Sequence, residues 1–403
     1  MKILMLSSTF PYPPTRGGTH NRTFNLLKPL SQNHSVTLIT LRSPEVKDEE
    51  VEGLRQWVDE LVMFPRPTKT GGGIGKKIQR TLEFLQKGTP PNVRYLYLPE
   101  IQQWVDRAVE AKQFDAITCE HSVNEIYARP QWKKQLTTVV DIHSSVYRTC
   151  KNQLETGTSD NALRDRFYLP LLHRYERNYC QKFSKVAVTT DEDWQQVKAF
   201  DSNSDVTVVP NGVDLEEFTY RTGDPGGYHL VFLGGMDYFV NIDAACTLGR
   251  EILPRLQEKY PETTLTLVGS KPAPEVRALA ERPGITVTGR VPSMTDYLHQ
   301  ATVFAAPLRA GFGMKIKTLE AMAAGAPVVG SDRTLEGLKV DGEGVILQAL
   351  RANTIDEFVE AISRLFENPE LRAQLSKNAR SHVENEYTWE RAGRRYEQLL
   401  LES

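Results

Sequence analysis

Cysteine is scarce in this 403-residue chain, and no Cys-x-x-Cys pair occurs among the four: Cys119, Cys150, Cys180 and Cys246. A disulfide framework, a zinc site and a redox motif are therefore not expected, and a reducing compartment fits. No apolar run approaches the ~20 residues of a membrane helix. The N-terminus reaches Pro11 and Pro13 too soon for a signal peptide. We expect a cytoplasmic protein, and leave open peripheral contact with the inner face of a membrane.

An excess of either charge is also absent, with 49 Lys and Arg against 51 Asp and Glu. A nucleic-acid-binding protein would be strongly basic, so no nucleic acid is expected as a partner. The glycine run 71–77 lacks the Ser or Thr of a P-loop, because Gly75-Lys76 is followed by Lys77. We interpret it as a solvated loop. With Lys69 and Arg80, contact with an acceptor or an anionic lipid is the alternative.

Short apolar runs alternate with helical patterns in two successive sets, which predicts parallel sheets covered on both faces. The expected strands are Lys2–Ser7, Ser35–Thr40, Asp115–Cys119, Thr137–Asp141 and Lys185–Thr189, then His229–Leu233, Thr264–Val268, Ile285–Thr288, Val303–Ala306 and Pro327–Val329. Residues 42–99 are interpreted as the irregular part of the first set. The fold class is therefore α/β, with two Rossmann-like, doubly wound domains.

The domain boundaries follow from composition. Pro, Asn and Gly cluster over residues 206–227 and indicate a linker. We expect an N-terminal domain over 1–205, a second domain over 228–385, and a C-terminal helix over 386–403 whose return to the first domain is left open. Two such sheets facing each other across a cleft would bind ligands at the carboxyl ends of their strands.

The strongest chemical signal is a strand end, a glycine loop and a helix start between Ala306 and Ser331. Gly311 and Gly313 allow backbone amides to approach a ligand closely. The helix N-terminus favours phosphate, and Lys315 and Lys317 add two positive charges. Glu320, one turn into the helix, is a candidate acceptor for a pair of ribose hydroxyls.

This string resembles the donor-binding signature of glycosyltransferase family 4, a retaining family of the GT-B fold. There, a carboxylate followed by Ala-Met-Ala-x-Gly-x-Pro-Val-Val holds the donor ribose. Three other stretches agree with the family, and the match is weak over residues 42–112: Phe10–Gly18, Val208–Asp214 with Phe218, and Phe232–Tyr238.

The resemblance implies transfer of a sugar from a UDP- or GDP-linked donor to an unidentified hydroxyl acceptor, saccharide or lipid-linked, in polysaccharide or glycolipid biosynthesis. It places the acceptor on the first domain and the nucleotide on the second. It implies no cofactor, no metal, and retention through same-face attack assisted by the leaving diphosphate.

Two departures from the family pattern are informative. Phe312 stands where many members carry the first carboxylate of a Glu-x7-Glu pair. The stretch 235–241 also lacks the Arg and Lys that usually hold the pyrophosphate. A diphosphate still needs positive partners, so we predict that Lys315, Lys317 and Arg309 replace them. The chain would then belong to a subgroup with a Gly-x-Gly-x-Lys-x-Lys loop.

Further site residues are implied by the resemblance. Donor contacts are expected from Gly17, Gly18, Gly235 and Met314, and Arg290 and Val291 would lie against a base that is uracil or guanine. A histidine of the family contacts the donor sugar near Glu120-His121. Because the alignment is uncertain by one residue, Glu120 is the rival of His121, and His143, at the next strand end, is a third candidate.

Two other functions remain open at this point. A nucleotide-sugar epimerase on a similar frame would need acid–base carboxylates, for which Glu120 and Asp141 are available. A non-catalytic nucleotide-sugar-binding protein would explain the missing first carboxylate. The fold alone does not separate these classes.

Overall fold

The computed structural model describes residues 1–67, 81–86 and 88–402. The predicted loop 71–77, with Lys69 and Arg80, lies outside the described residues. The chain divides into two compact units: the first is Met1–Pro210 together with residues from Ala392 onward, and the second is Asn211–Arg391.

The first unit is built on a seven-stranded, entirely parallel sheet in the order β3-β2-β1-β4-β5-β6-β7. The strands are β1 (Lys2–Ser7), β2 (Ser35–Arg42), β3 (Glu60–Pro65), β4 (Ala116–Glu120), β5 (Thr137–Ile142), β6 (Lys185–Val188) and β7 (Asp205–Val208). The central strands are buried on both faces, which is why they read as continuous apolar runs. In the register of β4 and β5, Glu120 lies opposite Asp141.

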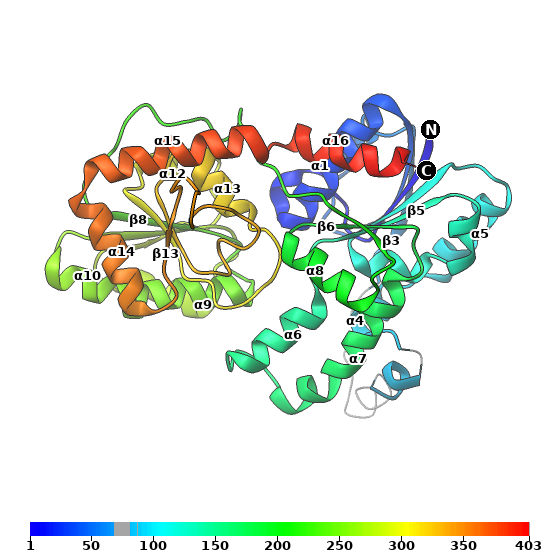
Figure 1. Ribbon diagram of the computed structural model, residues 1–403, viewed down its shortest axis with the longest axis horizontal. Coiled ribbons are helices and arrows are strands. Elements are labelled where there is room, and N and C mark those ends of the chain that lie inside the picture. Colours follow the sequence, from blue (N-terminus) through cyan, green and yellow to red (C-terminus); the bar gives the residue numbers. More distant parts are fainter. Residues whose placement is uncertain (68–80, 87, 403) are drawn as a thin grey trace. The chain divides into compact units, whose positions relative to one another are not determined.

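Helices connect these parallel strands (Figure 1). The α-helices are α1 (Gly18–Asn33), α2 (Asp48–Arg55), α4 (Pro91–Tyr95), α5 (Pro99–Glu110), α6 (Val146–Glu155), α7 (Ala162–Cys180) and α8 (Asp191–Phe200), and residues 81–86 are also helical. Short 3₁₀ segments are η1 (Pro14–Arg16), η2 (Ser122–Tyr127) and η3 (Pro130–Lys134).

The expectation of an irregular segment over residues 42–99 was wrong, because α2, β3, α4 and the start of α5 lie there. Strand β3 pairs only with β2, at the edge of the sheet, and its side chains are half-buried. Strand β7 is the opposite edge, where the linker was expected to begin. Strand β7 is short and alternates polar with apolar residues, so its pattern is weak, whereas β3 carries the apolar run 61–64 that the expectation of an irregular segment overlooked.

The second unit has a six-stranded parallel sheet in the order β10-β9-β8-β11-β12-β13. Its strands are β8 (His229–Leu233), β9 (Thr264–Val268), β10 (Ile285–Val287), β11 (Val303–Ala306), β12 (Val328–Gly330) and β13 (Leu350–Arg351). Its α-helices are α9 (Phe239–Thr247), α10 (Leu253–Lys259), α11 (Pro274–Arg277), α12 (Thr295–Gln300), α13 (Ile316–Ala323), α14 (Ile355–Glu367) and α15 (Pro369–Glu386), with a π-helical turn η4 (Leu248–Ile252) and a 3₁₀ segment η5 (Ala278–Glu281).

This second sheet is covered on both faces (Figure 1). Helices α9, α10 and α14 lie on one side of it, and α12 and α13 lie on the other. Both units therefore have the doubly wound, Rossmann-like architecture that the alternating pattern predicts.

The last helix, α16 (Trp389–Leu401), begins in the second unit, and its residues from Ala392 onward belong to the first. Within the described ranges, no helix combines the length and the apolar character of a membrane-spanning segment.

Candidate donor and catalytic site

The glycine loop lies at the carboxyl end of β11 and leads into α13. Gly311 and Gly313 both have φ of 84°, a left-handed conformation that favours glycine. The Lys315 ammonium donates hydrogen bonds to the carbonyls of Gly311 and Gly313. Asn211 donates a 3.0 Å hydrogen bond to the Met314 carbonyl. The loop is therefore fixed by its own lysine and by the residue that opens the second unit.

Lys317 lies in the first turn of α13, with its ammonium over the Phe232 ring at 4.6 Å from the centroid. It donates a 2.5 Å hydrogen bond to Oδ1 of Asn241, near the start of α9. Burial lowers the pKa of Lys317 to about 7, although the nearby Glu320 carboxylate opposes this shift. This lysine is thus held in a defined position inside the unit.

Glu320 is buried on α13. Burial and the charge of Glu217 raise the pKa of Glu320 to about 7. Among the described residues, no hydrogen-bond donor reaches its carboxylate. Its oxygens are not among the fully buried atoms that lack a partner, so they are open to water or to a ligand that supplies hydroxyl groups.

The other predicted donor residues are placed as follows. Arg309 forms an exposed bidentate ion pair with Asp243 of α9, so its charge is engaged within the protein. Arg290 is exposed in the loop after β10, and Val291 packs against the core of the second unit. The Gly235 carbonyl accepts a 2.8 Å hydrogen bond from Asn241.

Gly17 and Gly18 lie in the first unit, at the start of α1. A Cβ atom at Gly18 would meet nothing within 4 Å, and one at Gly17 would meet only the His20 ring at 3.6 Å. Packing does not require either glycine. The space in front of this helix start is open, which is compatible with a ligand phosphate there.

Glu120 ends β4 and is completely buried. Its Oε1 accepts hydrogen bonds from Tyr396 of α16 at 2.5 Å and from Thr118 at 3.0 Å, whereas Oε2 has no partner. Burial and the neighbouring Asp141 charge raise the pKa of Glu120 to about 8. At neutral pH this side chain is therefore mainly a neutral acid in the interior.

Asp141, on β5, forms a buried bidentate ion pair with Arg22 of α1, at 2.7 Å from Nε and 2.6 Å from Nη2. Burial alone would raise its pKa, but Arg22 and His143 hold the pKa of Asp141 well below its usual range. The His143 Nε2 atom lies 3.0 Å from Asp141 Oδ2 without hydrogen-bond alignment. The charge of this network is thus balanced by Arg22.

His121 follows Glu120 and adopts φ of 73°, which is unusual for a residue with a side chain. Its ring lies 4.9 Å from the ring of His143, in an edge-to-face arrangement. Burial, with His143 beside it, lowers the pKa of His121 to about 3, and burial also lowers that of His143. Two neutral imidazoles are therefore adjacent at the carboxyl ends of β4 and β5.

Glu120, Asp141 and His143 place potential metal-ligand atoms within 4.8 Å of one another. However, both oxygens of Asp141 already bind the Arg22 guanidinium. A cation at this position would meet that fixed positive charge at a short distance. The group is better explained as an internally neutralised network than as a metal site.

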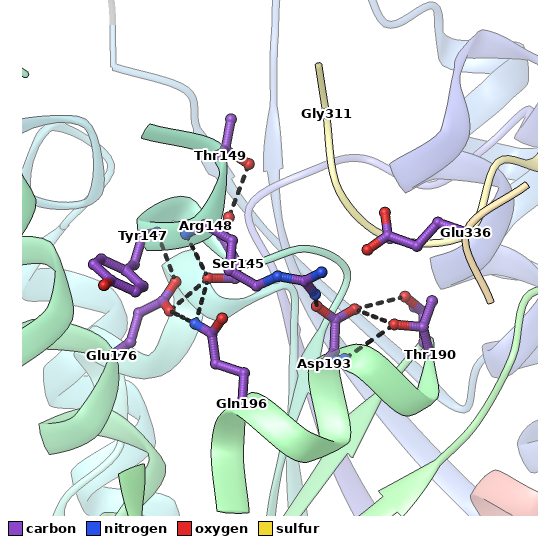
Figure 2. Close-up of polar contacts among 12 residues, drawn as sticks. Ser145, Tyr147, Arg148, Thr149, Glu176, Thr190, Asp193, Gln196, Gly311 and Glu336 are labelled. Atoms are coloured by element: carbon purple, nitrogen blue, oxygen red, sulfur yellow. Dashed lines mark hydrogen bonds and ion pairs between the residues drawn. The ribbon is translucent and has the colours of Figure 1, made fainter. Parts of the chain in front are cut away.

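Another buried carboxylate, Glu176 of α7, caps the N-terminus of α6 (Figure 2). It accepts hydrogen bonds from the Ser145 hydroxyl and from the backbone amides of Val146 and Tyr147. Gln196 also donates to it. This cluster is satisfied within the first unit and supports the helix that follows His143.

Three residues of these clusters escaped sequence reasoning. Arg22 looks like an ordinary polar residue of an amphipathic helix, and Tyr396 lies 276 positions from its partner Glu120. Asn241 ends the stretch that was noted for lacking a cation. No local pattern marks Asn241 as the partner of a lysine 76 positions away.

Two family models match this chain, and each match lies mainly in one of the two units. The model described as Glycosyltransferase Family 4 matches residues 16–217, which is half of the chain. The model described as Glycosyl transferases group 1 matches residues 227–368.

Curated relatives are similar over part of their length. The GDP-mannose-dependent monoacylated alpha-(1-6)-phosphatidylinositol monomannoside mannosyltransferase of Corynebacterium glutamicum is 28% identical over 222 residues, covering 50% of this chain and 58% of that protein. The phosphatidyl-myo-inositol mannosyltransferase of Mycobacterium tuberculosis is 32% identical over 142 residues, covering 32% of this chain and 35% of that protein. The chain thus spans less than two thirds of both. YtcC of Bacillus subtilis is 29% identical over 349 residues, covering 77% and 78%.

Solved structures are similar over the full chain. HepE of Anabaena in complex with UDP and glucose has a TM-score of 0.66 at 15% identity, covering 100% of both chains. TarM of S. aureus has a TM-score of 0.65 at 12% identity, covering 100% of this chain and 99% of that one. At these identities the likeness establishes the fold, which is that of the GT-B glycosyltransferases.

Proposed function

From the premise that this chain belongs to glycosyltransferase family 4, we propose that it transfers a sugar from a UDP- or GDP-linked donor to a hydroxyl acceptor, with retention and without a metal. Relatives are named as mannosyltransferases acting on phosphatidylinositol derivatives. A similar structure holds UDP-glucose. These names support a nucleotide-sugar donor and a saccharide or lipid-linked acceptor.

The arrangement on α13 carries the proposal. Glu320 is a buried carboxylate without a protein donor, and the ammonium of the partly buried Lys317 lies one turn earlier on the same helix. Two ribose hydroxyls would satisfy the carboxylate, and the diphosphate would take the lysine and the loop amides. With Lys317 and the helix N-terminus supplying positive charge, the leaving diphosphate needs no metal ion for neutralisation. Lys315 is an additional cation beside the same loop.

In the first unit, we assign His121 and His143 to the transferred sugar, with Glu120 as a supporting group. Both imidazoles are neutral at pH 7, so they would hydrogen-bond sugar hydroxyls without repelling an oxocarbenium-like transition state. The fully buried Glu120 carboxyl presents no surface to a ligand. Retention follows if the acceptor hydroxyl attacks the same face and passes its proton to the leaving diphosphate.

The test is a nucleotide-binding measurement on Glu320→Gln by isothermal titration calorimetry. Loss of hydrogen bonds to a charged group costs about 1.5–3 kcal/mol, so UDP or GDP affinity should fall about 10–100-fold. Glu216→Gln, which changes an exposed carboxylate next to Glu217, is the matched control. Wild-type affinity in Glu320→Gln would remove the ribose assignment.

A second experiment separates transfer from epimerisation and from binding alone. The protein is incubated with UDP- and GDP-sugars, and thermal stabilisation and donor products are followed. Stabilisation with slow donor hydrolysis supports transfer, since water then replaces the acceptor. An isomerised donor would support the epimerase, and stabilisation without any conversion would support a non-catalytic binding protein.

A further inference from the structure

Asn241 connects two parts of the donor side that the sequence leaves separate. Its side-chain amide donates a 2.8 Å hydrogen bond to the Gly235 carbonyl, after β8. Its Oδ1 accepts a 2.5 Å hydrogen bond from the ammonium of Lys317, on α13. One buried amide thereby joins the loop after the first strand of the unit to the helix that carries Lys317 and Glu320.

The contact is closely packed. A Cβ atom at Gly234 would lie 2.7 Å from Asn241 Nδ2 and 2.8 Å from Lys317 Nζ. Only glycine at this position leaves room for both side chains. On its other side, the ammonium lies over the Phe232 ring. The lysine is therefore confined by an amide oxygen, an aromatic face and a glycine backbone.

We infer that Asn241 is a positioning residue that holds the Lys317 ammonium at the Gly234–Met236 loop for the diphosphate of the donor. This inference rests on the proposed function. A positioning role also accounts for the missing cation in residues 235–241. The Asn241 amide on α9 orients a lysine that α13 supplies. Because Asn241 contributes an acceptor and no charge, it does not neutralise the positive charge of the protonated Lys317.

The electrostatic surroundings of Lys317 make the inference measurable. Burial disfavours its charged form, Glu320 favours it, and Lys315 disfavours it. Glu217 acts on Glu320 and thus on the same cluster. A hydrogen bond accepted from the ammonium stabilises the charged form, so its removal lowers the pKa of Lys317 below about 7.

The experiment measures the pKa of Lys317 in the full chain without ligand, by NMR of ¹⁵N-labelled lysine, with the signal assigned by its loss in Lys317→Arg. Asn241→Ala should lower this pKa by about one unit. Asn241→Asp, which retains the side-chain shape, should raise it. Unchanged values in both variants would overturn the inference.

Binding of UDP and of GDP is then measured from pH 6 to pH 9. Asn241→Ala should weaken nucleotide binding about tenfold at pH 8 but only about twofold at pH 6, where about half of the variant's Lys317 is protonated. Asn241→Asp should weaken it at every pH, because its carboxylate pairs with the lysine and repels phosphate.

The control is Asn241→Ala combined with Lys317→Arg. A guanidinium stays protonated throughout this range, so the pH-dependent part of the Asn241→Ala effect should disappear. An equal loss at all pH values in both backgrounds would indicate a merely structural role and overturn the inference.

Lys317→Ala separates the diphosphate assignment of Lys317 from the positioning role of Asn241. Unaltered nucleotide affinity in Lys317→Ala would refute the diphosphate assignment of the proposed function. In that case the NMR titration still reports whether Asn241 holds the lysine. If Lys317→Ala binds nucleotide more weakly but Asn241→Ala leaves the Lys317 pKa and the pH profile of binding unchanged, only the positioning role is refuted.

Discussion

At the residue scale, the interior of the first unit contains three ionisable side chains in contact with one another. Arg22, Glu120 and Asp141 are all buried near the carboxyl ends of β4 and β5. The pair of Arg22 and Asp141 is bidentate, and Glu120 remains neutral by holding its proton. Burying a charge is acceptable only when it is paired, so each member depends on the others.

Replacing Arg22 by Met should therefore destabilise the first unit by about 3–5 kcal/mol, because Asp141 is left as an uncompensated buried charge. Urea unfolding at pH 7 measures this effect. The double variant Arg22→Met with Asp141→Asn should lose less than Arg22→Met alone, since the orphan charge is gone. A single-variant loss below about 1 kcal/mol would contradict this account.

At the element scale, helix α6 begins against a carboxylate of another helix. The Glu176 carboxylate accepts hydrogen bonds from the backbone amides of Val146 and Tyr147, which have no partner inside α6 (Figure 2). Burial raises the pKa of Glu176 to about 7, although these hydrogen bonds favour the charged form. The helix start that follows His143 is thus coupled to the protonation of one side chain.

This coupling predicts a pH dependence of stability. The folded protein binds the Glu176 proton up to about pH 7, whereas the unfolded chain loses it near pH 4.5. Stability from this group therefore falls as pH rises through that window, by up to about 3 kcal/mol. The free energy of unfolding of Glu176→Gln minus that of the wild type should therefore increase from pH 5 to pH 8, because only the wild type loses this contribution.

The matched control for this titration is Glu192→Gln, which changes an exposed carboxylate in the first turn of α8. Its difference from wild type should be the same at both pH values. If Glu176→Gln is equally independent of pH, the raised pKa of Glu176 is wrong.

At the scale of the whole molecule, the chain starts in the first unit, forms the second, and returns to the first with α16. The returning part of the helix buries Tyr396, Leu399 and Leu400. Gly393 lies so close to α1 that a Cβ atom would be 2.4 Å from the Pro29 ring. The first unit is therefore completed only when the last residues of the chain are in place.

Gly393→Ala should destabilise the first unit by about 1–3 kcal/mol, because the added methyl group overlaps Pro29. In differential scanning calorimetry, the transition that does not respond to nucleotide should move to lower temperature. The nucleotide-stabilised transition of the second unit should stay in place. Gly223→Ala, where a Cβ atom meets nothing within 4 Å, is the control and should leave both transitions unchanged.

Much of the fold and part of the candidate site could be read from local sequence. The buried central strands, the glycine loop 311–313 and the position of Glu320 one turn into the helix after it follow from runs and spacings within a few residues. The edge strand β7 did not, because its four residues alternate polar with apolar ones, and the apolar run of β3 was not recognised as a strand. The short strand β13, of two residues, left no pattern at all.

Sequence by itself determined the α/β class, the two sets of strands and the residue types near the donor loop, since hydrophobic periodicity and glycine conformation are local properties. Only the tertiary structure decided which charges are paired. It assigned Arg309 to Asp243, Arg22 to Asp141 across 119 positions, and Lys317 to Asn241 across 76. Such pairs depend on distances in space, and elements far apart in sequence provide the partners that burial of a charge requires.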